Sequence, residues 1–148
     1  MSWSGIRADL KTTLEAISIT SPSAKTIKKV YETPPATIQD VPCFIIYPPR
    51  AEVTWGEGAA RRMYTVRCRL LLSDADLAVA ADLVDAFREA TVDKIGTTNL
   101  KIGTAAPFGV VVRLVIEEAG AIDLGGKKYA GLDCLLTLNI VGAASLAA

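Results

Sequence analysis

Histidine is absent from this 148-residue sequence, cysteine and methionine are scarce, and neither sign of charge is in excess. Without histidine, the chain lacks the side chain that most often transfers protons near neutral pH and the commonest nitrogen ligand of metals. The 16 basic and 16 acidic residues balance, so no overall field draws a monomer to DNA or to an anionic membrane. These features disfavour histidine-based enzymes, histidine metal sites and basic nucleic-acid-binding domains.

The three cysteines are widely separated and form no CxxC pair, which excludes the usual zinc spacings. Cys43, Cys68 and Cys134 lie in apolar, strand-like runs, and we expect buried free thiols that pack as small hydrophobic side chains. The apolar runs have the length of strands and fall short of the roughly 20 residues of a membrane span. The first residues contain no apolar signal segment. We therefore expect synthesis in the cytosol and no membrane partner.

Length and composition predict one domain over residues 1–148. Hydrophobic residues make up 51% of the chain and charged residues 22%, values that are ordinary for a folded soluble protein. A chain of this length buries roughly 70% of its unfolded surface, which is enough for a core without disulfide or metal support.

Apolar residues at steps of three and four predict two amphipathic helices. The first spans about residues 4–19, and Trp3 is expected to anchor its entrance in the core, with an exposed binding role as the alternative. The second follows Ser73, which with Asp76 resembles a capping box, and ends near Thr91. Its predicted buried stripe contains Leu77, Ala80, Leu83, Val84 and Phe87.

Alternating and proline-framed apolar runs predict the strands, because proline cannot donate a ladder hydrogen bond and marks strand ends or edges. The run 61–72 alternates most clearly: Thr65, Arg67 and Arg69 share one face, opposite an apolar face. A glycine-containing loop, GEGAA, joins it to the preceding strand. The predicted strands cover about residues 28–31, 43–47, 52–55, 61–72, 99–102, 110–118 and 132–140.

A tight turn is predicted at Gly125 and Gly126, which can adopt positive φ values. It joins the last two strands into a hairpin and fixes their register. Favourable cross-strand pairs follow, each worth about 0.2–1 kcal/mol: Asp123 with Lys128, and Ile122 with Tyr129.

Continued without a break, that register sets the apolar face of strand 132–140 against Arg113 and Glu117. One extra residue exchanges the faces and corrects the mismatch. We expect this β-bulge at Gly131, because an extra residue there places Ala119 opposite Asp133.

No motif in the sequence points to catalysis. The segments GEG and GGKK lack the spacing of a phosphate-binding loop and are interpreted as hairpin turns. Asp82, Asp85 and Glu89 have the helical spacing of a solvated outer face. We therefore expect no enzyme, no catalytic residue, no cofactor and no metal. An enzyme whose residues only the fold brings together stays open as a minor alternative.

Arginines on one sheet face are the unexplained feature. Arg67, Arg69 and Arg113 are matched by Glu117 and Asp133 on neighbouring strands. One interpretation is a solvated surface with weak ion pairs, each worth about 0–1 kcal/mol. The other is a subunit contact, where the planar donors of arginine are favoured.

The order of elements, the proline-bracketed strand TPPATIQDVPCFIIYPP and the closing strand YAGLDCLLTLNIV together resemble the tail terminator proteins of long-tailed, siphovirus-like bacteriophages. The resemblance covers most of the chain. It implies an α+β fold: a mostly antiparallel β-sheet with two amphipathic helices packed on one face and projecting β-hairpins.

The same resemblance implies a structural virion protein. It would assemble in the host cytoplasm into a homohexameric ring at the head-proximal end of the tail. The ring would cap the tail tube protein, end tube polymerisation and offer a docking surface to the head–tail connector (stopper) protein, with DNA passing through it in transit.

For this ring we expect the GEGAARR hairpin to form a projecting contact arm. The expected subunit-interface residues are Trp55, Arg61, Arg62, Arg67, Arg69 and Arg113. Another head–tail connector component, either a stopper or a head-completion protein, is the main alternative. An unrelated small binding domain or enzyme is the other.

Overall fold

The computed structural model describes residues 2–56, 59–73, 77–97, 101–103 and 108–141. It has a mixed α+β fold that is mostly β-sheet with two helices, which confirms the predicted class. The elements in chain order are α1 (Ser2–Glu15), β1 (Ser18–Ile19), β2 (Lys25–Thr26), β3 (Lys29–Tyr31), β4 (Cys43–Ile46), β5 (Arg50–Gly56), β6 (Ala59–Ser73), α2 (Leu77–Thr97), β7 (Lys101–Ile102), β8 (Phe108–Leu124) and β9 (Lys127–Val141).

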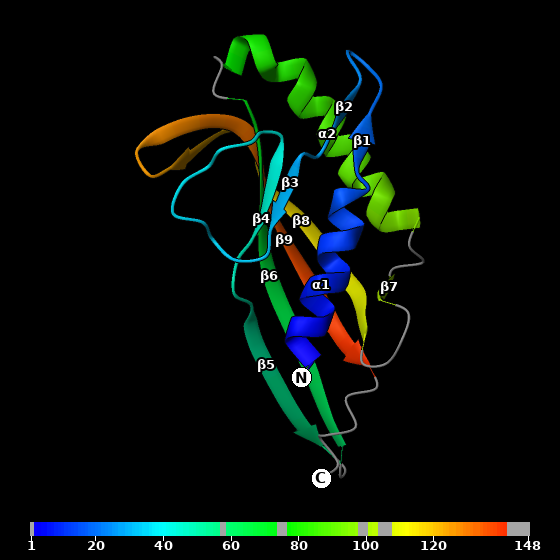
Figure 1. The fold of residues 1–148 in the computed structure, drawn as a ribbon. Coiled ribbons are helices and arrows are strands. Elements are labelled where there is room, and N and C mark those ends of the chain that lie inside the picture. Colours follow the sequence, from blue (N-terminus) through cyan, green and yellow to red (C-terminus); the bar gives the residue numbers. More distant parts are fainter. Residues whose placement is uncertain (1, 57–58, 74–76, 98–100, 104–107, 142–148) are drawn as a thin grey trace.

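One seven-stranded sheet forms the centre of the molecule (Figure 1). Its order is β3-β4-β6-β9-β8-β7, and β5 pairs with β6 beyond the end of β4. The pairing of β3 with β4 is parallel, and the other pairings described here are antiparallel. The strands β1 and β2 form a separate short ribbon.

Most helices and strands lie close to the residues predicted from the sequence, but both helices end at residues other than those predicted. Helix α1 ends at Glu15, and residues of its predicted last turn form β1 instead. Helix α2 continues past Thr91 to Thr97, because Ile95 extends the buried stripe. The proposed cap residue Asp76 and the start of strand 99–102 lie outside the described residues.

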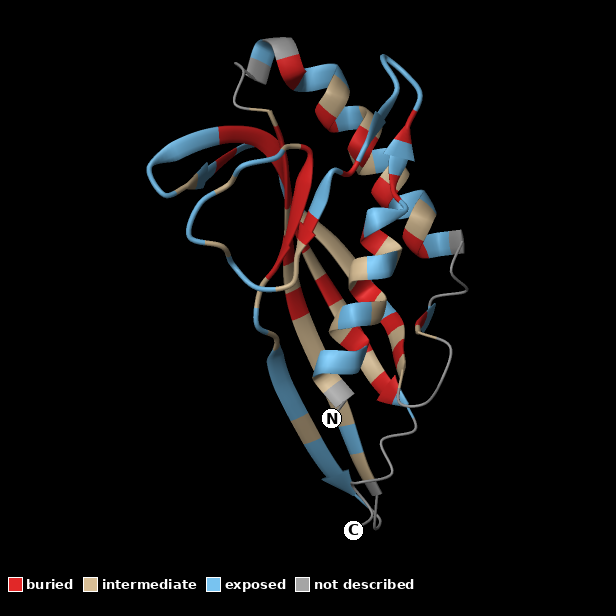
Figure 2. Cartoon of the chain, in the orientation of Figure 1, coloured by how far each residue is buried: buried red, intermediate tan, exposed pale blue. Residues whose placement is uncertain are grey.

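The main core lies between the two helices and one face of the sheet, the helix-covered face (Figure 2). Phe87 of α2 is fully buried there, and burying a side chain of this size contributes about 1.5–3 kcal/mol. The alternation predicted for β6 is confirmed, since its apolar residues face this core. The principal contributors are Ile6, Leu10 and Leu14 of α1, Ala80 and Val84 of α2, Val66, Cys68, Leu70 and Leu72 of β6, and Leu132, Cys134, Leu136 and Leu138 of β9.

A second, smaller cluster lies on the opposite side of the sheet, which we call the free face. Cys43 and Ile45 of β4 and Leu71 of β6 point to this side. Ile122 and Tyr129, from the end of the β8–β9 hairpin, pack against them. The hairpin end therefore covers the free face beside β4, and neither described helix lies on the rest of that face (Figure 1).

The β8–β9 turn agrees with the sequence prediction. Gly125 and Gly126 have φ values of 59° and 80°. The predicted pairs form: Asp123 lies opposite Lys128, and Ile122 lies opposite Tyr129.

The predicted position of the bulge is wrong. Pairing between β8 and β9 runs unbroken through Gly131, and the extra residue is Glu117 of β8; a second register shift occurs at Val112. Strand β9 pairs on both sides, so an extra residue there would disturb two ladders, whereas among the described residues β8 has an outer-side partner only where it pairs with β7. With these two shifts Val111 is buried in the main core and Val112 is 52% exposed.

Gly131 has a different role, at the contact between β9 and β6. A Cβ atom at this position would overlap the backbone carbonyl oxygen of Leu70. The register of β6 against β9 shifts between Leu71 and Ser73, next to this contact. Glycine is therefore required here because the backbone of the neighbouring strand approaches too closely for any side chain.

Candidate assembly surface

A charge network lies on the free face, where three neighbouring strands meet. Arg67 of β6 donates a hydrogen bond from Nη1 to Oδ1 of Asp133 at 2.6 Å. Its Nη2 atom lies 2.9 Å from Oε1 of Glu117. The bulge at Glu117 therefore brings a carboxylate of β8 to an arginine two strands away. The pairing of Arg67 with both acids agrees with the sequence.

Arg69 joins the same network from the next outward position of β6. Its Nε atom lies 3.6 Å from Oδ2 of Asp133, and its guanidinium group lies 5.2 Å from the ring centre of Tyr47. Asp133 is only 7% exposed, so one buried carboxylate holds two arginines in place. Arg69 Nε and Tyr47 Oη are themselves buried, and neither makes a hydrogen bond with the described chain.

The network holds Arg67 in place. Its hydrogen bond to Asp133, and then the nearby charges of Asp133 and Glu117, raise the pKa of the Arg67 guanidinium above its usual value despite some burial. Because arginine is charged at every physiological pH in any case, the network affects the position of this side chain and not its charge. Held between two carboxylates, it forms a rigid part of the surface, unlike a freely rotating side chain.

Arg113 does not join the network, contrary to the grouping made from the sequence. Arg113 lies on β8, opposite Thr137 of β9, and its side chain is exposed. It makes no ion pair with the residues that the structure describes. The bulges at Val112 and Glu117 separate it from the acids, which sequence alternation alone could not reveal.

The β5–β6 ribbon projects beyond the rest of the sheet as an arm (Figure 1). Pairing with β9 reaches β6 at Arg62, so Thr54–Gly56 and the β6 residues before Arg62 form a two-stranded tip. Trp55, in this tip, is 75% exposed. Arg61 is exposed, and Arg62 is half-buried between Val53 and Ile140.

The base of the arm is anchored to α1 by an aromatic contact that the sequence did not predict. The rings of Trp3 and Tyr64 meet edge to face, with centroids 5.7 Å apart and planes at 70°. Such pairs contribute about 0.5–1.5 kcal/mol beyond their buried area. Trp3 is half-buried against the main core, as expected for an anchor, while Trp55 is the exposed tryptophan.

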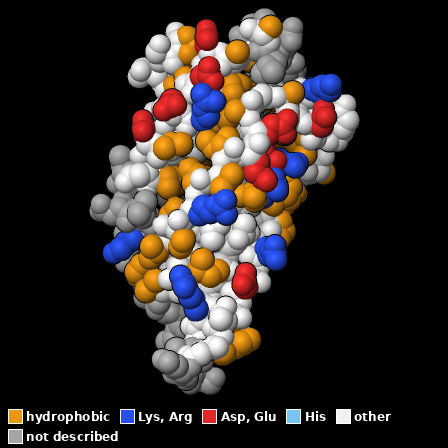
Figure 3. Space-filling view, turned by 180° about the vertical axis from the view of Figure 1, so that it is seen from behind, with side chains coloured by type: hydrophobic (Ala, Val, Ile, Leu, Met, Phe, Trp, Pro, Cys, Tyr) orange, Lys and Arg blue, Asp and Glu red, His pale blue; other side chains and the backbone are white. Residues whose placement is uncertain are grey.

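The free face mixes apolar and charged groups (Figure 3). Hydrophobic side chains gather over its central part, and basic and acidic side chains border them. Val115 and Leu135, which pair across β8 and β9, are half-buried on this side.

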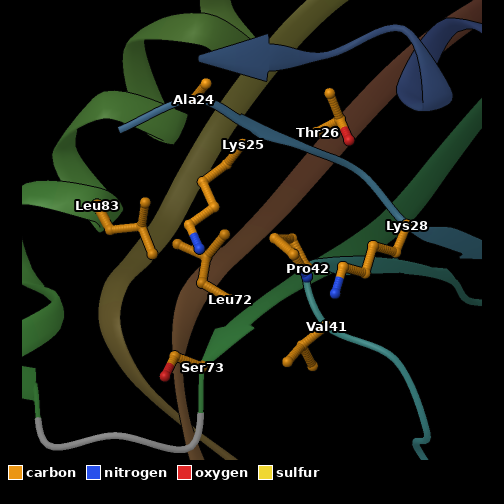
Figure 4. A pocket seen from close by; sticks show the side chains of 9 residues that line it. All are labelled: Ala24, Lys25, Thr26, Lys28, Val41, Pro42, Leu72, Ser73 and Leu83. Carbon is orange, nitrogen blue, oxygen red and sulfur yellow. The ribbon is translucent and has the colours of Figure 1, made fainter. Parts of the chain in front are cut away.

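A hollow of about 450 Å³ lies at the other end of the sheet, between β2, the end of β6 and α2 (Figure 4). Polar and apolar groups contribute comparable parts of its lining, and the ammonium groups of Lys25 and Lys28 border it. The remaining polar groups of the described lining are hydroxyls of Thr26 and Ser73. The lining residues are Ala24, Lys25, Thr26, Lys28, Val41, Pro42, Leu72, Ser73 and Leu83.

All three cysteines are free and buried, as predicted. Burial raises the pKa of the Cys43 thiol to about 11, helped by the negative charge of Asp40. Burial likewise raises the pKa of Cys134 to about 12 and that of Cys68 further, with Asp133 adding to both. These thiols are core side chains and poor nucleophiles.

We expect the thiols to be almost inert in the folded protein. At pH 8, a thiol reagent should modify Cys43 at least about 100-fold more slowly than a free cysteine, because the thiolate fraction falls tenfold for each unit by which the pKa rises. In urea all three should react fully. Rapid modification of one thiol in the folded chain would contradict the burial described above.

Among the described residues, no group of three or more histidine, cysteine or acidic side chains is placed to hold a metal ion. Neither described helix is long and apolar enough to cross a membrane. A scan against protein-family models finds no match to the chain, and a search of curated proteins finds no similar sequence.

Proposed function

We propose that this chain is a structural virion protein, a tail terminator of a long-tailed phage. Its ring caps the tail tube, ends tube polymerisation and provides the docking surface for the head. The projecting β5–β6 arm with its exposed tryptophan carries the proposal, because a large exposed apolar side chain on a projecting ribbon marks a surface that another protein covers.

The exposure of Trp55 is the strongest argument for a partner. An indole ring contributes 150–250 Å² of buried area in a contact, and tryptophan is the residue type most enriched among those that dominate binding energy. The tip of the arm gains little from its own core, since the β5 residues are exposed or half-buried on both faces. The free-energy cost of ordering this poorly buried tip is offset if the arm binds a neighbouring subunit or the tube.

The free face supports the same function by a different route. The Asp133 network holds Arg67 and Arg69 in fixed positions, which lowers the entropy lost when a partner contacts them. The acids that hold these arginines also balance their charge. If this face lines a channel, DNA can pass without being retained, because tight binding requires several unneutralised basic groups.

We expect Trp55→Ala to weaken ring assembly by about 30-fold or more, the loss typical of a residue that dominates an interface. Unfolding stability should change by less than about 0.5 kcal/mol, because the side chain is exposed in the free chain. Sedimentation velocity over a range of protein concentrations measures assembly, and negative-stain electron microscopy shows the rings.

The matched control is Val92→Ala, which truncates another exposed hydrophobic residue, on the outer side of α2. It should assemble as the unmodified chain does. Equal assembly of Trp55→Ala and the unmodified chain would remove the arm from the interface. Immunogold labelling of intact particles tests the location: label at the head-proximal tube end supports a terminator, and label on the portal side indicates another connector component.

A further inference from the structure

Among the described residues, the longest unpaired edges of the sheet belong to β5 and β8, which lie on opposite sides of the β6–β9 pair. In the described part of the chain, β5 pairs with β6 alone, so its outer edge is open along Arg50–Gly56. On the other side, β7 covers β8 only at Gly109 and Val110. No other described residue pairs with the rest of the outer edge of β8. Open edges present rows of backbone donors and acceptors that can pair with another chain.

The two edges differ in the protection they carry. The β5 edge has an unbroken register with β6 and contains neither proline nor lysine, the residues that commonly block an edge. The β8 edge is interrupted by register shifts at Val112 and Glu117, which leave a regular segment at Arg113–Ile116. A partner strand can therefore pair with β8 only over this short segment and its immediate neighbours.

Charges on the two edges are complementary in one antiparallel register. When Glu52 of β5 lies opposite Arg113 of β8, Arg50 lies opposite Val115 and diagonally beside Glu117. Glu52 and Arg113 are both exposed, and neither has an ion-pair partner among the described residues. In the pairings within one chain, Arg50, Glu52 and Arg113 all lie at positions that face the free face. The sheets of the two copies would therefore join with their free faces on the same side.

We propose that the β5 edge of one copy pairs antiparallel with the Arg113–Ile116 segment of β8 in a second copy, with Glu52 opposite Arg113. The contact joins two different edges, so each copy keeps one of these edges free to bind the next copy. Successive contacts close into a ring when the rotation from one subunit to the next is a whole fraction of 360°. This inference rests on the proposed function, since it names the strands that would form the ring.

Charge reversal tests the pairing. We expect Glu52→Arg and Arg113→Glu each to weaken assembly at least tenfold, because each places like charges directly opposite one another. The double variant restores an opposite pair and should recover assembly to within about threefold of the unmodified chain. Asp82→Arg, an equal change of charge on the outer side of α2, is the control and should assemble normally. Sedimentation velocity measures all four variants.

Amide hydrogen exchange gives a second readout that does not depend on charge. Assembly should slow exchange at least tenfold in β5 and in Arg113–Ile116, because their outward amides become hydrogen-bonded. Rings that form equally with either single variant, or that leave both edges unprotected, overturn the pairing and leave the proposed function intact. A chain that stays monomeric at high concentration also overturns the pairing; particle labelling then decides the proposed function separately.

Discussion

Replacing Gly131 with alanine should destabilise the protein by about 3 kcal/mol, although the change adds a single methyl group. The new Cβ would overlap the carbonyl oxygen of Leu70, which is main chain and cannot rotate away as a side chain can. Relief requires β6 and β9 to separate at the centre of the sheet, and forcing extra atoms into a packed interior costs about 1–3 kcal/mol or more. Chemical denaturation with urea measures the loss.

Gly5→Ala is the matched control, because it makes the same substitution in α1, where a Cβ meets nothing within 4 Å. It should stabilise the chain by about 0.5–1 kcal/mol, since alanine is the better helix former. For a chain of this size, Gly131→Ala should lower the melting temperature by about 6–12 °C while Gly5→Ala raises it slightly. Equal melting temperatures would show that the two strands are not held this closely.

The role of Gly131 also shows where inference from the sequence stops. The mismatch of faces in the hairpin register suggested a bulge at Gly131, and a bulge does occur in this ladder, but in β8 at Glu117. The location depends on which strand is central and which has an open edge. The order of the strands is a property of the whole sheet, and the residue pattern of a single strand cannot predict it.

Local patterns succeeded where one face of an element is buried. The alternation of β6 gave the correct faces because the main core lies against a single side of the sheet, and the turn at Gly125–Gly126 fixed its own cross-strand pairs. The predicted end of α2 at Thr91 failed for a specific reason. Thr91 Oγ1 donates a hydrogen bond to the carbonyl oxygen of Phe87 at 2.7 Å, so a residue that is usually unfavourable inside helices is accommodated within one.

The candidate surface was predicted in part. Outward positions on neighbouring strands correctly grouped Arg67 with Glu117 and Asp133. The contact of Arg69 with Tyr47 was not foreseen, because the chain after β4 continues beside β6 with a hydrogen bond from Tyr47 N to Arg67 O at 2.9 Å. Contacts of this kind require knowing which strands are neighbours.

Asp133→Asn should destabilise the protein by about 2–3 kcal/mol, because the carboxylate that holds two arginines becomes neutral while the shape of the side chain is kept. Asp133 is 7% exposed, and removing one partner of a buried charge group leaves the others without compensation. Glu117→Gln removes a charge from the same network at a side chain that is 42% exposed, so it should cost less than about 1 kcal/mol. Urea denaturation compares the two variants.

Measuring both variants at low and high salt distinguishes the loss of a buried carboxylate from a general effect of removing a negative charge. The loss at Glu117 should shrink when ionic strength rises to about 1 M, since solvent ions screen an exposed pair. The loss at Asp133 should persist, because a buried carboxylate is screened much less. If Asp133→Asn costs no more than Glu117→Gln, then Arg67 and Arg69 are not held by the buried acid, and the fixed arginine positions that we assign to the free face lose their physical basis.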